Sequence, residues 1–175
     1  MDVVLRRCLG GFLPIFGLAA CLSLGGCANA PTKADSQAGY VVRDSQGQVT
    51  KLAGKPQRIL SLTLGTDEIL MALVSPDRVA GLTQYAFDPG ISNIAGQAGQ
   101  VKGQIRDVNA EAVLAIKPDL VVAWDFVGPE AVRTMREIGI PLFVCKTPAS
   151  IADIRQAVLD IAEAVGEGAK GQAIA

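Results

Sequence analysis

One segment, NAEAVLAIKPDLVVAWD, constrains the fold of this chain more than any other. It begins at Asn109, a predicted helix N-cap whose side chain can accept a hydrogen bond from an N–H of the first turn. The helix is expected to end at Lys117, because Pro118 disfavours a helical backbone in the residue before it. Residues 120–123 are apolar without alternation, which is typical of a parallel strand covered on both faces. Trp124 follows at the carboxyl end of this strand, where open α/β sheets bind ligands.

Strands and helices alternate through most of the chain. A β-hairpin is predicted over residues 40–52, around a Ser-Gln-Gly turn. Strand–helix units are expected to follow it, with strands at residues 58–62, 78–82, 120–123 and 142–145. This order predicts the α/β class, with a mainly parallel sheet, right-handed crossovers and helices on both faces.

Capping residues mark the predicted helices. Thr66 is the expected N-cap of the first helix. A later helix is expected over residues 130–138, after a proline at its first position. Ser150 and Asp153 resemble a capping box at the start of the last long helix. Residues 91–104 are rich in Gly and Gln, so a short helical turn and irregular chain are expected there.

The N-terminus has the pattern of a secretory signal. Two arginines precede an apolar run over residues 8–24, which Gly and Pro interrupt and which is short for a membrane span. The sequence Leu-Gly-Gly-Cys ending at Cys27 resembles the lipobox of bacterial lipoproteins. This resemblance implies that residues 1–26 are a lipoprotein signal peptide and that Cys27 carries lipid, such as palmitate, which holds the protein at a membrane surface. The alternative is an ordinary signal with a chance cysteine.

The remaining chain divides into a tether, a lobe and a helix start. Residues 27–39 are rich in Ala, Ser, Thr and Gln, which is typical of a flexible tether. Residues 40–166 are long enough for one compact lobe. Residues 167–175 resemble the start of a helix that has no visible cap, stop signal or partner. We therefore expect the chain to be truncated there, with a second lobe absent.

Composition excludes several classes of site. The sequence has no histidine, which excludes Ser-His-Asp catalysis and histidine-containing metal sites. Its net charge is −1 and no basic stripe is present, which argues against a nucleic-acid partner. Once a signal peptide and a lipidated Cys27 are set aside, Cys145 is the remaining cysteine. Its apolar surroundings favour a core position over a reactive thiol.

The loops that follow the predicted strands lack the motifs of nucleotide binding and of hydrolysis. The first loop, LTLGTD, has one glycine and an acid, whereas phosphate-binding loops need several glycines. No Gly-x-Ser-x-Gly elbow is present. A carboxylate pair could come from five acids: Asp67, Glu68, Asp88, Asp107 and Asp125. Helix capping and solvated loops explain the same acids, so no catalytic residue, cofactor or metal ligand is assigned.

Aromatic residues follow two of the predicted strands. Tyr85 and Phe87 lie in the loop after the second strand, and Trp124 ends the third. Such residues at strand ends suit a large, flat, partly apolar ligand. Core packing is the alternative for each. We favour it for Phe87 and favour ligand contact for Tyr85 and Trp124.

Four sequence blocks resemble the cobalamin- and ferric-siderophore-binding proteins of ABC importers. The blocks are PQRILSL, DEIL, DRVAG and the segment from NAE through KPDLV. This helical-backbone (class III) family implies two α/β lobes joined by one long rigid helix, with the ligand held between them. By this resemblance the chain supplies the N-terminal lobe and the first turns of the interlobe helix.

The resemblance also implies roles for individual residues. In the family a glutamate on each lobe docks against arginines of the permease, and Glu111 occupies the N-lobe position. Complementarity to the helix dipole explains the same residue, so both roles stay open. Arg106 could face an anionic siderophore, although a solvated arginine is the alternative. The expected ligand-contacting residues are Thr63, Leu64, Tyr85, Arg106, Trp124 and Asp125.

The leading hypothesis is therefore a lipid-anchored solute-binding protein outside the cytoplasmic membrane. It would capture a metal chelate, which is a ferric siderophore, haem or cobalamin, and deliver it to an ABC permease without catalysing a reaction. One alternative is an enzyme on the same scaffold, such as a chelatase or a carboxylate-dependent hydrolase. Another is a truncated lobe that acts only as an interaction module.

Overall fold

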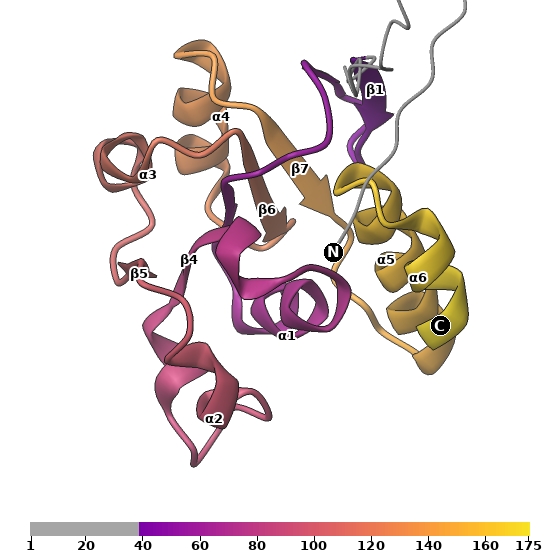
Figure 1. The fold of residues 1–175 in the computed structure, drawn as a ribbon. Helices are drawn as coiled ribbons and strands as arrows, with labels where there is room; N and C mark the ends of the chain where they lie inside the picture. Colours follow the sequence, from indigo (N-terminus) through magenta and orange to yellow (C-terminus); the bar gives the residue numbers. More distant parts are fainter. Residues whose placement is uncertain (1–38) are drawn as a thin grey trace, which may run out of the picture. The chain divides into compact units, whose positions relative to one another are not determined.

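The computed structural model describes residues 39–175 of the chain (Figure 1). Its strands are β1 (Tyr40–Arg43), β2 (Val49–Leu52), β3 (Ile59–Ser61), β4 (Val79–Thr83), β5 (Gln104–Ile105), β6 (Leu120–Trp124) and β7 (Leu142–Cys145). Its α-helices are α1 (Leu64–Leu73), α2 (Ala95–Ala98), α3 (Ala110–Ile116), α4 (Pro129–Glu137), α5 (Ile151–Ala164) and α6 (Gly168–Ile174). Two 3-10 turns are η1 (Pro76–Arg78) and η2 (Gln84–Phe87). The predicted signal peptide, Cys27 and nearly all of the predicted tether lie outside the described residues.

The main sheet is parallel and has the strand order β5-β4-β3-β6-β7. The first strand, β3, lies at its centre, where Ile59 pairs with Val79 of β4 on one side and with Leu120 of β6 on the other. The chain then builds the sheet outward, first through β4 and β5 and later through β6 and β7. The strand order therefore reverses between β3 and β6, and this switch point is where open α/β sheets form ligand crevices.

Helices cover both faces of the sheet, as the sequence predicts. Buried side chains of α1 and α5, such as Leu70 and Ile161, form one core with the strands. Buried side chains of α3 and α4, such as Val113 and Met135, form a second core on the other face. Figure 1 shows α1 and α5 on one side of the strands and α3 and α4 on the other. The central strands are buried throughout, which explains their continuous apolar sequence.

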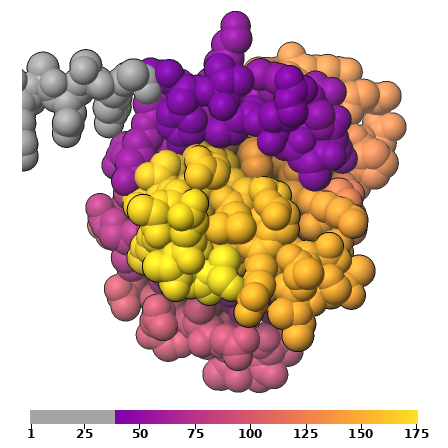
Figure 2. All heavy atoms as spheres, turned by 90° about the vertical axis from the view of Figure 1, so that its right-hand side faces the viewer, coloured from indigo at the N-terminus to yellow at the C-terminus, as the bar shows by residue number. Residues whose placement is uncertain are grey.

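The hairpin of β1 and β2 lies against β7 without joining the sheet. The hydroxyls of Ser45 and Thr50 donate to the carbonyls of Val144 and Leu142. The Tyr40 hydroxyl donates to the Ala164 carbonyl at 2.7 Å, and Figure 2 shows the hairpin beside the C-terminal helices. The bonds to β7, which include one from the Ser45 N–H to the Val144 carbonyl, cover an edge of the sheet that would otherwise expose unpaired backbone groups.

Several predicted boundaries are confirmed. The strand at residues 142–145 has the bounds expected. Asn109 caps α3, since its side chain accepts a hydrogen bond from the Ala112 N–H at 2.8 Å. Lys117 ends this helix in the left-handed region, at φ 53°. Ser150 caps α5 by accepting from the Asp153 N–H at 3.1 Å.

Three predictions differ from the structure. The N-cap of α1 is Thr63 and not Thr66, because the Thr66 hydroxyl is buried and bonded to neighbouring hydroxyls. The short strand β5 was not predicted, since it has only two residues in a Gly- and Gln-rich segment. The last helix, α6, does have a partner: a methyl group at Gly171 would lie 2.3 Å from Cβ of Ala162 in α5. Helix α6 therefore packs closely on α5.

No helix within residues 39–175 combines the length and the apolar character needed to cross a membrane.

Candidate functional site

The candidate site is the edge of the sheet where the parallel strands end. Each helix that follows a strand starts near this edge, so the first turns of α1, α3, α4 and α5 lie there with the exit loops. Two aromatic side chains at the edge are exposed, Tyr85 by 52% and Phe126 by 65%. Tyr85 lies in η2 after β4, and Phe126 follows β6 directly beside the switch point. The edge therefore presents apolar aromatic surface on both sides of β3.

Trp124 does not lie in the exposed position that the sequence suggested. Its side chain is 6% exposed and belongs to the core between the sheet and α1. The indole packs on the first turn of α1, where a methyl group at Gly65 would lie 2.6 Å from Nε1 of Trp124. As the last residue of β6, Trp124 points to the face covered by α1. It therefore packs beneath the start of α1 and does not face the solvent at the edge.

Phe126 is the exposed aromatic that sequence reasoning did not assign. It lies two residues beyond Trp124, where the side-chain alternation of the strand no longer applies. The sequence signal for it is its place in the loop between the predicted strand at residues 120–123 and the proline that starts the next helix. Phe87, by contrast, is half-buried and packs against the core, as favoured from the sequence.

Thr63 and Leu64 lie where β3 turns into α1. Thr63 is buried, and its hydroxyl is 2.7 Å from the Thr66 hydroxyl, so its side chain shapes the turn. Leu64 is half-buried and remains the part of this loop that can contact a ligand.

Asp125 joins two exit loops. One of its carboxylate oxygens accepts the Thr147 N–H at 3.0 Å and also the Thr147 hydroxyl. The hydrogen bond from the Thr147 side chain is the main cause that lowers the pKa of Asp125 below its ordinary value. The side chain is therefore an anion at neutral pH and ties the loop after β6 to the loop after β7.

Arg106 and Glu111 lie near the end of β5. Arg106 is exposed, and its guanidinium is 3.4 Å from the side-chain oxygen of Gln104. Glu111 is exposed in the first turn of α3, and Leu114, one turn further along, is 49% exposed. An exposed acid beside an exposed apolar side chain can serve as a protein-docking surface.

A buried carboxylate lies beneath the edge. Asp67 in α1 is fully buried and accepts the N–H and the hydroxyl of Thr83 at the end of β4. Burial is the main cause that raises the pKa of Asp67 from 3.8 to about 6, against the hydrogen bonds from Ser61 and Thr83, which lower it. Asp67 is bonded to Thr83 at the end of β4 and Asp125 to Thr147 in the loop after β7, so each carboxylate has a structural partner.

The described residues include no cluster of three or more His, Cys, Asp or Glu side chains that could hold a metal ion. Cys145, the free cysteine of this part of the chain, is buried, and burial raises the pKa of its thiol far above the ordinary value. It is thus a core side chain, as expected from the sequence.

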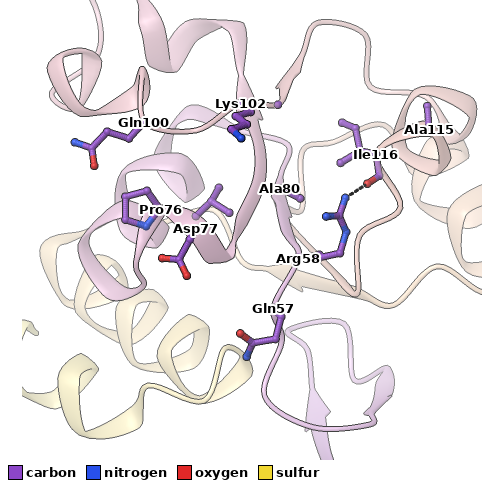
Figure 3. Close-up of a pocket in the computed structure, with 11 residues that line it drawn as sticks. Gln57, Arg58, Pro76, Asp77, Ala80, Gln100, Lys102, Ala115 and Ile116 are labelled. Atoms are coloured by element: carbon purple, nitrogen blue, oxygen red, sulfur yellow. Dashed lines mark hydrogen bonds between the residues drawn. The ribbon is translucent and has the colours of Figure 1, made fainter.

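A hollow of about 760 Å³ lies at the opposite edge, where the strands begin (Figure 3). Residues before β3, β4 and β5 line it, among them Arg58, Asp77 and Lys102. Arg58 is already engaged, because its guanidinium donates to the carbonyls of Ile116 and Lys117 at 2.7 and 3.0 Å. A smaller hollow of about 360 Å³ adjoins the candidate edge and is lined in part by Asp125, where the loop after β6 meets α4.

Comparison with known proteins finds relatives that are named for binding a substrate or ligand. No family model matches the sequence. The chain is similar to the uncharacterized ABC transporter substrate-binding lipoprotein YvrC of Bacillus subtilis, with 27% identity over 159 residues that cover 85% of this chain and 49% of YvrC. A cobalamin-binding protein of Halobacterium salinarum is 28% identical over 131 residues, covering 74% of this chain and 35% of that protein.

Structural comparison agrees with the sequence comparison. The periplasmic heme-binding protein RhuT from Roseiflexus sp. RS-1, in apo form, matches with a TM-score of 0.55 and 28% identity, covering 67% of this chain and 44% of RhuT. The chain therefore spans about half or less of the length of the relatives it matches, which fits a single lobe. All three relatives are named for binding a substrate or ligand.

Proposed function

We propose that this chain, a homologue of the substrate-binding proteins of ABC importers, is the substrate-binding component of such an importer. It captures a metal chelate at the edge where the parallel strands end and delivers it to the permease. The observation that carries this proposal is the pair of exposed aromatics, Tyr85 and Phe126, on either side of the central strand. The relatives named for substrate binding support the same reading.

The ligand is a large chelate with an apolar face. Cobalamin, haem and ferric siderophores have this character, and two of the relatives are named for binding cobalamin and heme. Aromatic side chains contribute through stacking and through the apolar area removed from water, about 25 cal/mol per Å². Arg106 at the end of β5 supplies a positive charge for a chelate that carries carboxylates. Leu64 adds apolar contact at the switch point.

Glu111 serves the permease. Its exposure, its place at the candidate edge and the adjacent exposed Leu114 suit a contact with a cationic protein surface. Lipid on Cys27 would keep the protein at the outer side of the cytoplasmic membrane, close to this partner. The importer's ATPase supplies the energy, and this chain carries out no chemical step.

A titration of the full chain tests the proposal. Cyanocobalamin, hemin and ferrichrome are added in turn, and heat and the fluorescence of Trp124 are followed; Trp124 is the one tryptophan of the sequence. Saturable binding of one chelate is expected, with quenching of the tryptophan emission. Absence of heat and of quenching with all three chelates would contradict the proposal.

A further inference from the structure

The buried carboxylate of Asp67 has no role in the site described so far. It lies in the first turn of α1 and is completely excluded from solvent. Its oxygens accept the Thr83 N–H at 3.2 and 3.3 Å and the Thr83 hydroxyl at 2.5 Å. Both donors of one residue therefore converge on one carboxylate, and this links α1 to the last residue of β4.

Asp67 lies beside a group of buried hydroxyls. Those of Ser61 and Thr63 each lie 2.7 Å from the Thr66 hydroxyl, on the same face of the sheet. Within the described residues, every buried side-chain nitrogen and oxygen has a hydrogen-bond partner. Such a fully satisfied polar network in a dry interior is rigid and holds its members in one arrangement.

Thr83 connects this network to the ligand edge. It is the N-cap of η2, the turn that carries Tyr85. On one side of Tyr85 the turn is fixed by the Thr83–Asp67 bonds, and on the other by Ala86, which is fully buried. The exposed Tyr85 ring is thus presented by a short segment whose first anchor is the Asp67 carboxylate.

We propose that Asp67 is a positioning residue for the ligand edge: its carboxylate holds Thr83 and the Tyr85 turn in place, and its protonation loosens that turn. This inference rests on the proposed function, because it assigns a purpose to the position of Tyr85. Charge-assisted hydrogen bonds are about twice as strong as neutral ones, so the ionised carboxylate is the stronger anchor.

The surroundings of Asp67 support titration near neutral pH. Its pKa is about 6, because burial and, to a smaller extent, the charge of Glu68 on the same helix raise it more than the hydrogen bonds from Ser61 and Thr83 lower it. The strands β3 and β4 present hydroxyls, and on this face β6 and α5 present the apolar side chains Val122 and Ile161. Because the Thr83 bonds favour the ionised form, proton binding weakens those bonds while the carboxylate stays buried, although it stabilises the folded protein as a whole.

Amide hydrogen exchange on the full chain measures the loosening directly. After correction for the intrinsic rate, exchange at Thr83 and Tyr85 is expected to be about tenfold faster at pH 5 than at pH 7.5, the change that one pKa unit of coupling gives. Equal corrected rates at the two pH values would overturn the proposal. A side chain with only a structural role would show no such pH dependence.

Variants assign the effect to the carboxylate. Asp67→Asn has no titrating group and is expected to show the same corrected exchange at both pH values. Asp160→Asn, an equal change at an exposed acid of α5, is expected to behave like the wild-type chain. If Asp67→Asn fails to fold, Thr83→Val removes the hydroxyl and keeps the N–H; it is expected to speed exchange at Tyr85 already at pH 7.5. Unchanged exchange in Thr83→Val would overturn the proposal.

Ligand affinity separates this inference from the proposed function. Cyanocobalamin and hemin are titrated at pH 7.5 and pH 5 into the wild-type chain, Asp67→Asn and Asp160→Asn. Wild type and Asp160→Asn are expected to lose about tenfold in affinity at pH 5 relative to Asp67→Asn. Binding with the same pH dependence in all three proteins would overturn the inference and leave the proposed function intact. If neither probe binds and ferrichrome does not bind either, the proposed function fails, and the exchange rates alone decide the role of Asp67.

Discussion

The first turn of α1 passes so close to Trp124 that a methyl group at Gly65 would lie 2.6 Å from the indole Nε1. No real Cβ contact is that short, so either the helix or the indole must move to admit a side chain. The glycine lets α1 begin directly over the end of β6. The switch point, with Leu64 and Phe126, therefore lies next to a buried tryptophan.

Gly65→Ala is expected to destabilise the protein. Alanine normally stabilises a helix relative to glycine by about 1 kcal/mol, but the clash with Trp124 should outweigh this gain. Overpacking of this kind lowers the free energy of unfolding by about 1–3 kcal/mol. Chemical denaturation measures the change, and a shift of the Trp124 emission maximum should accompany it.

Gly96→Ala is the matched control. Gly96 lies in α2, and nothing lies within 4 Å of a methyl group placed there. Its substitution is expected to be neutral or to stabilise by up to about 1 kcal/mol. Equal effects of the two substitutions would contradict the packing of Gly65 against Trp124.

Arg78→Met is expected to weaken the junction of α5 and α6. The guanidinium of Arg78 is buried and donates to the carbonyls of Pro56 and Val165 and to the Glu167 carboxylate. Losing it removes the donor of the Pro56 and Val165 carbonyls and leaves Glu167 paired with Lys55 alone. Removing one partner of a buried pair costs about 3–5 kcal/mol. Thermal and denaturant unfolding measure the loss.

Arg133→Met serves as the comparison for Arg78. Arg133 pairs with Glu130 and Glu137 on the exposed face of α4, where both partners are largely solvated. Exposed pairs of this kind contribute about 0–1 kcal/mol. A loss in Arg78→Met no larger than in Arg133→Met would show that the buried bonds of Arg78 do not hold the junction.

The free energy of unfolding should rise as the pH falls from 7 to 5. The pKa of Asp67 is about 6 in the folded protein and 3.8 as the ordinary value, so the folded state binds the proton more tightly. The stabilisation is complete below pH 3.8 and is lost as pH rises through 6; between pH 7 and pH 5 the gain is about 1 kcal/mol.

Other carboxylates act in the opposite direction and at lower pH. The pKa values of Asp125, Asp153 and Glu167 are lowered in the folded protein, so their contributions are lost only below about pH 4.5. Asp67→Asn should therefore remove the rise between pH 7 and pH 5 and leave the acid unfolding below it. A variant that retains the full rise would contradict the burial of this carboxylate.

Glu111→Gln should reduce delivery to the permease without changing ligand affinity. Transport is measured with the importer in membrane vesicles, and affinity is measured separately with the full chain. Glu130→Gln is the matched control, because Glu130 is an exposed glutamate in the first turn of α4. Equal loss of transport in both variants would assign the effect of Glu111 to its helix terminus and not to docking.

The sequence predicted the parts of the fold that local chemistry determines. The Asn109 cap, the end of the helix at Lys117 and the strand at residues 142–145 follow from side-chain hydrogen bonding, from the proline that comes next and from apolar runs. The hairpin and the alternation of strands and helices followed in the same way. These features depend on neighbours in sequence, so they can be read without the tertiary structure.

The parts that sequence reasoning missed depend on contacts distant along the chain. Trp124 is buried because Gly65 lets α1 approach it. Asp67 can be buried in α1 because Thr83, at the end of β4, donates two hydrogen bonds to it. The direction of a side chain just beyond a strand, as for Phe126, depends on how its loop turns. Pattern alone places such residues at the correct edge but does not say which of them face the solvent.

The most direct test of the account is the affinity of a Tyr85→Ala/Phe126→Ala chain for the chelate that the wild-type chain binds. Two exposed rings that contact the ligand should cost about 1–3 kcal/mol together, which is roughly a tenfold to hundredfold loss of affinity. Ile138→Ala, which truncates an exposed apolar side chain at the end of α4, should bind like the wild type. Unchanged affinity in the double variant would contradict the central claim that the ligand is held at the edge where the parallel strands end.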